Sequence, residues 1–224
     1  MNAPSSDRPT TGRSVADAAT PRPTPDGAPV TRPAARGLAL SEIVAIVVLG
    51  VVFGFLYFAL VTAWKALAVA MGPAGDLAQN VLIGGWMVAA PLALFITRRP
   101  GAGVIAEVIA SLVEVVFLGS PVGPILFVSA LVQGVGAELA FAATRYRNHG
   151  LPVYLASGAT AALASFAWST VRFGWWGQDL FWLRLGLHVA SGVVLCGLLA
   201  WLLGRALART GVLRDLPGGR AVRG

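Results

Sequence analysis

Six long apolar segments, separated by short stretches that contain polar residues, glycine or proline, dominate the chain from residue 41 onward. About 20 consecutive apolar residues suffice for a helix to cross the hydrocarbon core of a bilayer. In lipid such segments must be helical, because exposed strand or loop backbone would leave its polar groups without partners. The sequence therefore predicts an all-α polytopic membrane protein with six transmembrane helices, at about 41–63, 77–97, 102–118, 125–144, 151–171 and 181–203.

The overall composition agrees with this fold class. Hydrophobic residues make up 56% of the chain and charged residues 12%, whereas a soluble domain carries about 25% charged residues. The single cysteine, Cys196, lies inside the sixth span, so no disulfide framework is available and we expect a small core residue.

The two ends of the chain differ from the spans. Residues 1–37 are rich in Pro, Thr, Ala, Arg and Asp and contain no apolar stretch, so we expect a disordered N-terminal tail and no signal peptide. The six-helix transmembrane domain is expected at 38–204, followed by a basic tail at 205–224.

The basic residues predict the orientation. One side of the membrane would receive Arg32, Arg36, Arg98, Arg99, Arg145, Arg147, Arg205, Arg209 and Arg214, and the other only Lys65, Arg172 and Arg184. Cytoplasmic loops carry the excess of Lys and Arg. We therefore expect a multi-pass protein of the cell membrane with both termini in the cytoplasm. The net charge of +7 is explained by this placement, and no nucleic acid partner is expected.

Two connections on the outer side have distinctive sequences. Residues 64–76 are semi-apolar and too short to span, which favours a lid lying on the outer face. The other connection contains Trp175 and Trp176, with Trp182 close by. Such residues are typical of an interfacial aromatic belt, and the alternative is a gate over a ligand.

Three carboxylates lie within the apolar segments. Glu107 and Glu114 are seven residues apart, on one face of the third span, and Glu138 lies in the fourth. A carboxylate at the bilayer centre costs roughly 2.5–3.5 kcal/mol on insertion scales. The antiparallel helices would place Glu114 level with Gln133 in the outer half, and Glu107 level with Glu138 deeper in the membrane.

These residues allow two interpretations. The inner pair, Glu107 and Glu138, could be protonated and hydrogen-bonded as a packing device. The outer pair, Glu114 and Gln133, is our candidate for ligand contact. With Asn80, Trp86, Trp168 and His188 they would form a pocket for a small, flat, nitrogen-rich or cationic molecule, held by carboxylates and tryptophan rings.

Several classes of site are missing from the sequence. The chain has no phosphate-binding loop of the ATPase type, no His-Glu-x-x-His, no Gly-x-Ser-x-Gly and no cysteine/histidine cluster. We therefore expect neither an enzyme nor a cofactor or metal. Gly50 and Gly54 form a small-xxx-small pattern on the first span, which permits close packing against another membrane helix.

The sequence resembles the YkoE family. This family comprises substrate-binding S components of energy-coupling factor (ECF) transporters, assigned to hydroxymethylpyrimidine or thiamine. The resemblance covers about 38–203 and rests on Glu107, Glu114, Arg98-Arg99-Pro100-Gly101-Ala102-Gly103, Gln133-Gly134-Val135-Gly136-Ala137-Glu138 and Arg145-Tyr146-Arg147. It implies a six-helix bundle that captures a vitamin from outside and works with a transmembrane coupling subunit and cytoplasmic ATPases. It also implies that Gly50 and Gly54 contact the coupling subunit.

The expected substrate-binding set is thus Asn80, Trp86, Glu107, Glu114, Gln133, Glu138, Trp168 and His188. The alternative function is a stand-alone proton- or cation-coupled carrier that uses Glu107 and Glu138 as a relay. An intramembrane enzyme is disfavoured because no nucleophile–base pair or metal-ligand set is present.

Overall fold

The computed structural model describes residues 38–223, and every regular element among them is helical. The tail predicted at 1–37 lies outside the described residues. The elements are α1 (Leu40–Ala70), η1 (Gly72–Leu77), α2 (Ala78–Leu82), η2 (Ile83–Met87), α3 (Ala89–Thr97), α4 (Ala102–Leu112), η3 (Val113–Phe117), α5 (Ile125–Ala143), α6 (Leu151–Phe173), α7 (Phe181–Ser191), η4 (Gly192–Leu198), α8 (Leu199–Arg209) and α9 (Pro217–Arg223). Here η1 and η2 are 3₁₀ turns, and η3 and η4 are π-helical segments.

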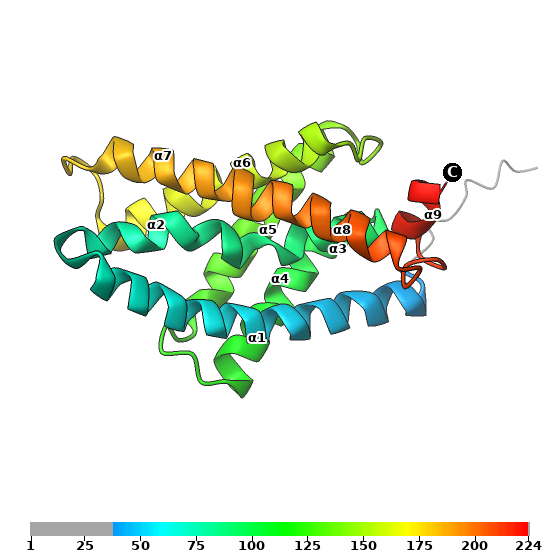
Figure 1. Cartoon of the computed structure of the whole chain (residues 1–224), viewed down its shortest axis with the longest axis horizontal. Coiled ribbons are helices and arrows are strands. Elements are labelled where there is room, and N and C mark those ends of the chain that lie inside the picture. The colour runs from blue at the N-terminus through cyan, green and yellow to red at the C-terminus, as the bar shows by residue number, and fades with distance from the viewer. Residues whose placement is uncertain (1–37, 224) are drawn as a thin grey trace, which may run out of the picture. The chain divides into compact units, whose positions relative to one another are not determined.

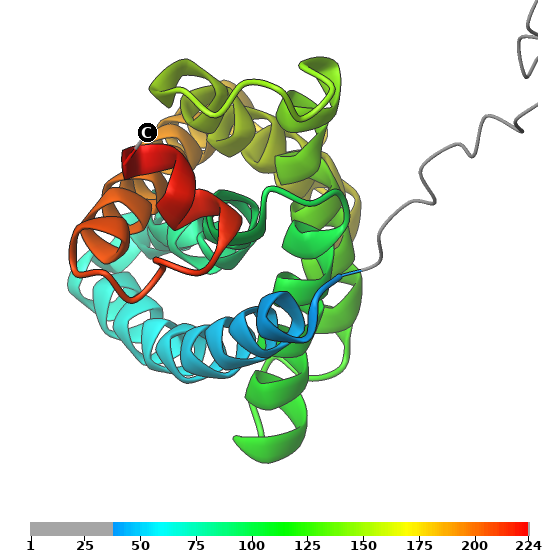
Figure 2. The same cartoon turned by 90° about the vertical axis from the view of Figure 1, so that its right-hand side faces the viewer.

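These elements form six helical passes between two ends of a bundle. In Figure 1, α1, α2–α3 and α7–α8 run along the long axis, and α4 and α5 cross between them obliquely. Figure 2, seen from one end, shows the passes arranged in a ring. α6 packs against both α5 and η4, which closes the ring on that side.

One of the six predicted spans falls short of the length of a full membrane crossing. Five helices in the described chain are long and apolar enough to cross a membrane: Leu40–Ala70, Gly72–Thr97, Ile125–Ala143, Leu151–Phe173 and Phe181–Arg209. The remaining pass consists of the 11 residues of α4 and the five of η3. Its length is about 24 Å, less than the roughly 30 Å hydrocarbon core.

The first helix is longer than predicted, and the predicted lid at 64–76 is correspondingly shorter. Residues 64–70, rich in alanine, continue α1 to Ala70, because such residues favour helix. The chain turns at Gly72, whose φ of +55° suits glycine. The connection on the outer side is thus reduced to η1.

Close backbone contacts hold the passes together. A Cβ atom added to Gly158 would lie 2.2 Å from the carbonyl oxygen of Gly192, so α6 and η4 touch backbone to backbone. One added to Gly84 would lie 2.1 Å from the carbonyl oxygen of Ser191. Small residues at such positions let membrane helices pack tightly.

Gly50 and Gly54 lie in a similar seam within the chain. Both are buried, and their added Cβ atoms would lie 2.6 Å from Ile109 on α4 and Val113 on η3 respectively. The structure therefore gives these glycines an intramolecular packing role. The outward side of α1 carries Val44, Val48 and Val52 instead, each about half exposed.

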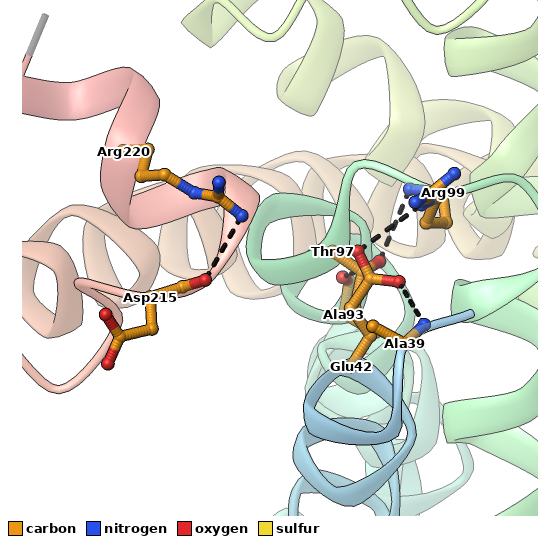
Figure 3. A network of polar contacts seen from close by, with 7 residues as sticks. All are labelled: Ala39, Glu42, Ala93, Thr97, Arg99, Asp215 and Arg220. Carbon is orange, nitrogen blue, oxygen red and sulfur yellow. Dashed lines mark hydrogen bonds and ion pairs between the residues drawn. The ribbon is translucent and has the colours of Figure 1, made fainter. Parts of the chain in front are cut away.

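The end of the bundle that holds the first described residues is fixed by polar contacts (Figure 3). Glu42 accepts a hydrogen bond from the backbone N–H of Ala39 at 2.9 Å and forms an ion pair with Arg99 at 3.3 Å. At the same end α8 continues to Arg209, so the predicted tail at 205–224 is helical in part. α9 then packs on α3: a Cβ added to Gly218 would lie 2.1 Å from the carbonyl oxygen of Phe95.

Candidate functional site

A cavity of about 320 Å³ lies within the bundle, lined by α1, α2, η2, α4, η3, α5, α6 and the turn before α5. Its volume is at the lower end of the range for small-molecule sites. Five of the eight predicted binding residues line it: Trp86, Glu107, Glu114, Gln133 and Trp168. One cavity therefore brings together five of the residues proposed from the sequence.

Glu107 lies at a break in the second pass. α3 begins in the interior of the bundle, where its first N–H groups have no partner within the helix. The Glu107 Oε1 atom accepts hydrogen bonds from the backbone N–H of Ala90 at 2.9 Å and from the Tyr57 hydroxyl at 3.0 Å. The Tyr57 oxygen in turn accepts the N–H of Ala89 at 3.0 Å. Glu107 and Tyr57 therefore cap α3 from two other helices.

Glu114 lies on η3, two turns farther along the same pass. Its Oε1 atom accepts a hydrogen bond from the Ser120 hydroxyl at 2.9 Å. Neither Glu107 Oε2 nor Glu114 Oε2 receives a hydrogen bond from the described residues, and neither is among their fully buried unpaired atoms. Each carboxylate thus has one oxygen committed to the protein and one available in the cavity.

The α5–α6 side of the cavity is polar as well. The Gln133 amide donates to the Ser165 hydroxyl at 3.4 Å, and the Trp168 indole donates to the Ser129 hydroxyl at 3.0 Å. These contacts fix the side chains on the cavity wall. The Gln133 carbonyl oxygen makes no hydrogen bond with the described residues, so it remains available to a ligand.

Two tryptophans form an aromatic corner of the cavity. The rings of Trp64 and Trp86 meet edge to face, with centroids 6.5 Å apart and planes at 84°. A flat ligand ring can stack on one of them while its edge contacts the other, and a cation can lie over either face.

Glu138 is hydrogen-bonded within the protein, as in the packing interpretation. It does not line the cavity. Its carboxylate accepts the backbone N–H groups of Gly101, Gly103 and Val104, at 2.9, 2.9 and 3.2 Å, and the Tyr146 hydroxyl at 2.8 Å. It therefore caps the N-terminus of α4. Burial, and then the hydrogen bond to Glu138, raise the pKa of Tyr146 to about 12.

The predicted pairs at matching depth are therefore not hydrogen-bonded pairs. Glu107 and Glu138 share no hydrogen-bond partner among the described residues, because each caps a different helix. Glu114 binds Ser120, and Gln133 binds Ser165, although both line the same cavity. No sequence pattern indicates these backbone donors, which are N–H groups at the starts of α3 and α4.

Asn80 and His188 also lie outside the cavity. Asn80 Oδ1 and His188 Nδ1 are 3.0 Å apart, and both residues are fully buried. The imidazole packs against the rings of Phe166 and Trp175, at centroid distances of 5.4 and 6.4 Å. The pair joins α2 to α7 beside the site, which corrects their predicted role as lining residues.

Further lining residues were not predicted, notably Tyr57, Trp64, Lys65, Ser165, Ser169 and Arg172. On α6 the sequence did contain a usable signal. Ser165, Trp168, Ser169 and Arg172 recur at i, i+3, i+4 and i+7, the spacing of a single helix face.

An ion pair joins the segments beside the cavity. Arg184 on α7 binds Asp76 in η1 and Gln178 in the loop before α7. Its guanidinium also lies over the ring of Trp175, 5.2 Å from the centroid. Arg184 is buried. Its contacts tie η1 to the loop before α7 that contains Trp175 and Trp176, here called the aromatic loop. Trp176 and Trp182 remain exposed, as expected of a membrane interface.

Comparison with known proteins identifies the class of this bundle. Residues 41–164 match the family model described as "ABC-type cobalt transport system, permease component". Among the described residues, no group of three or more His, Cys, Asp and Glu side chains could hold a metal ion.

A curated relative and a solved structure are similar over most of the chain. The relative is a protein of Bacillus subtilis (strain 168) named as an HMP/thiamine permease protein, YkoE. It is 34% identical over 186 residues, which cover 82% of this chain and 92% of the relative. The structure is described as a crystal structure of an S-component of an ECF transporter. It has a TM-score of 0.77 and 33% identity, and the match covers 84% of this chain and 94% of that one. The chain belongs to the YkoE family of S components, the substrate-binding subunits of ECF transporters.

Proposed function

We propose that the cavity binds hydroxymethylpyrimidine or thiamine. The observation that carries this proposal is the pair of carboxylates, Glu107 and Glu114, each with one oxygen free in a cavity that also contains the Trp64–Trp86 corner. An aminopyrimidine supplies amino hydrogens to carboxylate oxygens and a flat ring to tryptophan. The thiazolium ring of thiamine adds a cation, which carboxylates and indole faces attract.

The ligand would enter from outside the cell. Among the described residues, Arg98, Arg99, Arg145, Arg147, Arg205 and Arg209 lie where helices meet the end opposite η1. The positive-inside rule assigns that end to the cytoplasm. With six passes both termini are then cytoplasmic, and the cavity opens outward.

The chain would act as a binding subunit and not as an enzyme or a motor. ATP hydrolysis would come from cytoplasmic ATPases through a transmembrane coupling subunit. The sequence predicts that this subunit contacts Gly50 and Gly54, which in this structure would require α1 to separate from α4. The exposed row Val44, Val48 and Val52 on α1 is accessible without such a change.

Isothermal titration of the purified full chain tests the ligand assignment. We expect saturable binding of thiamine or hydroxymethylpyrimidine at one site per chain, and weakened binding when Trp86 is replaced by alanine. Exposed Trp182 offers a matched control, because Trp182→Ala removes the same group outside the cavity. Absence of saturable binding with both molecules would refute the assignment.

Reconstitution of the chain alone in liposomes tests the mode of action. We expect no uptake without ATPases and a coupling subunit. Uptake by the isolated chain, driven by a proton or cation gradient, would instead support a stand-alone carrier.

A further inference from the structure

The cavity has two chemically different levels. Gly54 packs against Val113, next to Glu114, so this part of α1 lies level with the carboxylates. Lys65 also lines the cavity, but it lies eleven residues farther along α1, about 16 Å nearer the end of the helix. On α6, Arg172 is seven residues beyond Ser165, the partner of Gln133, or about 10 Å. The carboxylates are therefore deep, and two cationic side chains lie at the mouth.

These two cations are not part of an ion pair in the described chain. Neither Lys65 nor Arg172 forms an ion pair or a hydrogen bond with a described residue, and both side chains are exposed. The contact of Arg172 is with the neighbouring ring of Phe173, 4.8 Å from its centroid. The third basic residue at this end, Arg184, is by contrast paired with Asp76. The described cations at this end that form no ion pair are therefore the two that line the cavity.

Such a mouth does not suit every ligand of the proposed function. A pyrimidine bound at the deep carboxylates presents no group to Lys65 and Arg172, and the thiazolium cation of thiamine gains nothing from them. A phosphate group complements them, since Lys and Arg bind phosphate by charge-assisted hydrogen bonds.

The structure also has room for a longer ligand. Beside the cavity lies an open hollow that shares Trp64, Gln79 and Phe173 with it. The two spaces therefore adjoin each other along these side chains. Lys65, which follows Trp64, and Arg172, which precedes Phe173, lie at the same end of the cavity.

We infer that the site selects ligands that carry a phosphate monoester at one end and an amino-heterocycle at the other. The heterocycle would bind at Glu107 and Glu114, and Lys65 and Arg172 would hold the phosphate. This inference rests on the proposed function and narrows its substrate class to the phosphorylated form of the vitamin.

Titration of the full chain with thiamine and with thiamine monophosphate, each at low and high salt, tests the inference. We expect the monophosphate to bind about tenfold more tightly at low salt, with the preference shrinking as salt screens the exposed cations. Lys65→Gln together with Arg172→Gln should remove the preference, by weakening monophosphate binding about tenfold relative to thiamine binding. Arg147→Gln, an arginine at the opposite end, is the matched control and should retain the preference.

The outcomes separate this inference from the function on which it rests. Thiamine binding as tight as monophosphate binding in the unchanged chain would overturn the inference and leave the proposed function standing. An equal loss of both ligands in the double variant would also overturn it. Binding of neither molecule to the unchanged chain would refute both.

Discussion

Replacing Glu114 by glutamine removes a charge from the cavity and changes little else. Within the described chain, Glu114 accepts one hydrogen bond, from Ser120, and the amide oxygen of glutamine can still accept it. What is lost is the charged oxygen that faces the ligand. Hydrogen bonds to charged groups contribute about 1.5–3 kcal/mol, so Glu114→Gln should weaken thiamine binding by about 10- to 100-fold.

Glu138 provides a matched control, because the same Glu→Gln change there affects a helix cap. Its two oxygens accept four donors, from Gly101, Gly103, Val104 and Tyr146. An amide group has one acceptor oxygen, and its N–H₂ would face two of these donors. With about 1–3 kcal/mol for each of these two donors left unpaired, we expect a loss of roughly 2–6 kcal/mol and a melting temperature lower by about 4–24 °C.

The assay is isothermal titration together with a thermal melt of each variant in the same detergent. Glu114→Gln should lose affinity and keep its melting temperature, while Glu138→Gln should show the reverse when titrated well below its melting point. Unchanged affinity in Glu114→Gln, or a similar loss of affinity in both variants, would refute the division between ligand contact and helix cap.

Three further predictions concern other parts of the structure. Gly54→Leu should lower the melting temperature, because a Cβ atom at this position would lie 2.6 Å from Val113. Val48→Leu on the exposed side of α1 is the control. Equal melting temperatures of the two variants would contradict close packing of α1 against η3 at Gly54. Arg184→Gln should speed thiamine dissociation, because it releases η1 from the aromatic loop. Stopped-flow tryptophan fluorescence can measure the dissociation rate. An unchanged rate would show that the Arg184–Asp76 ion pair does not hold the site closed. Tyr146 should ionise near pH 12, above the ordinary value of about 10. Its contribution to stability is then fully present below about pH 10 and is lost as the pH rises through 12; alkaline melts should show this loss in the unchanged chain and not in Tyr146→Phe.

The sequence predicted the membrane class, most span boundaries and the polar residues that gather between the helices. Helical periodicity could place Glu107, Glu114 and Gln133 on inward faces, because polar and ionisable side chains within a membrane span almost always face the interior of the helix bundle. It could not show that α3 starts inside the bundle after η2. That break exposes the N–H groups of Ala89 and Ala90, and it makes Glu107 a helix cap as well as a lining residue.

Other misses have similar local causes. Lys65 and Arg172 lie at the ends of their helices, where sequence reasoning treats charges as topology signals and not as part of a site. Glu138 and Gly101 are far apart in sequence, so their contact depends on how α5 packs against α4. Asn80 and His188 were predicted to line the pocket, and periodicity did not reveal that they lie outside the cavity and bind each other.

The proposed function requires that one cavity, with carboxylates deep inside and tryptophans at one corner, receives the vitamin. The most direct measurement is an experimental structure of the chain with thiamine bound. We predict the aminopyrimidine within hydrogen-bond distance of Glu107 or Glu114 and next to the ring of Trp86. Thiamine bound elsewhere, such as beside Asn80 and His188 or on the exposed face of α1, would contradict the assignment of this cavity as the binding site.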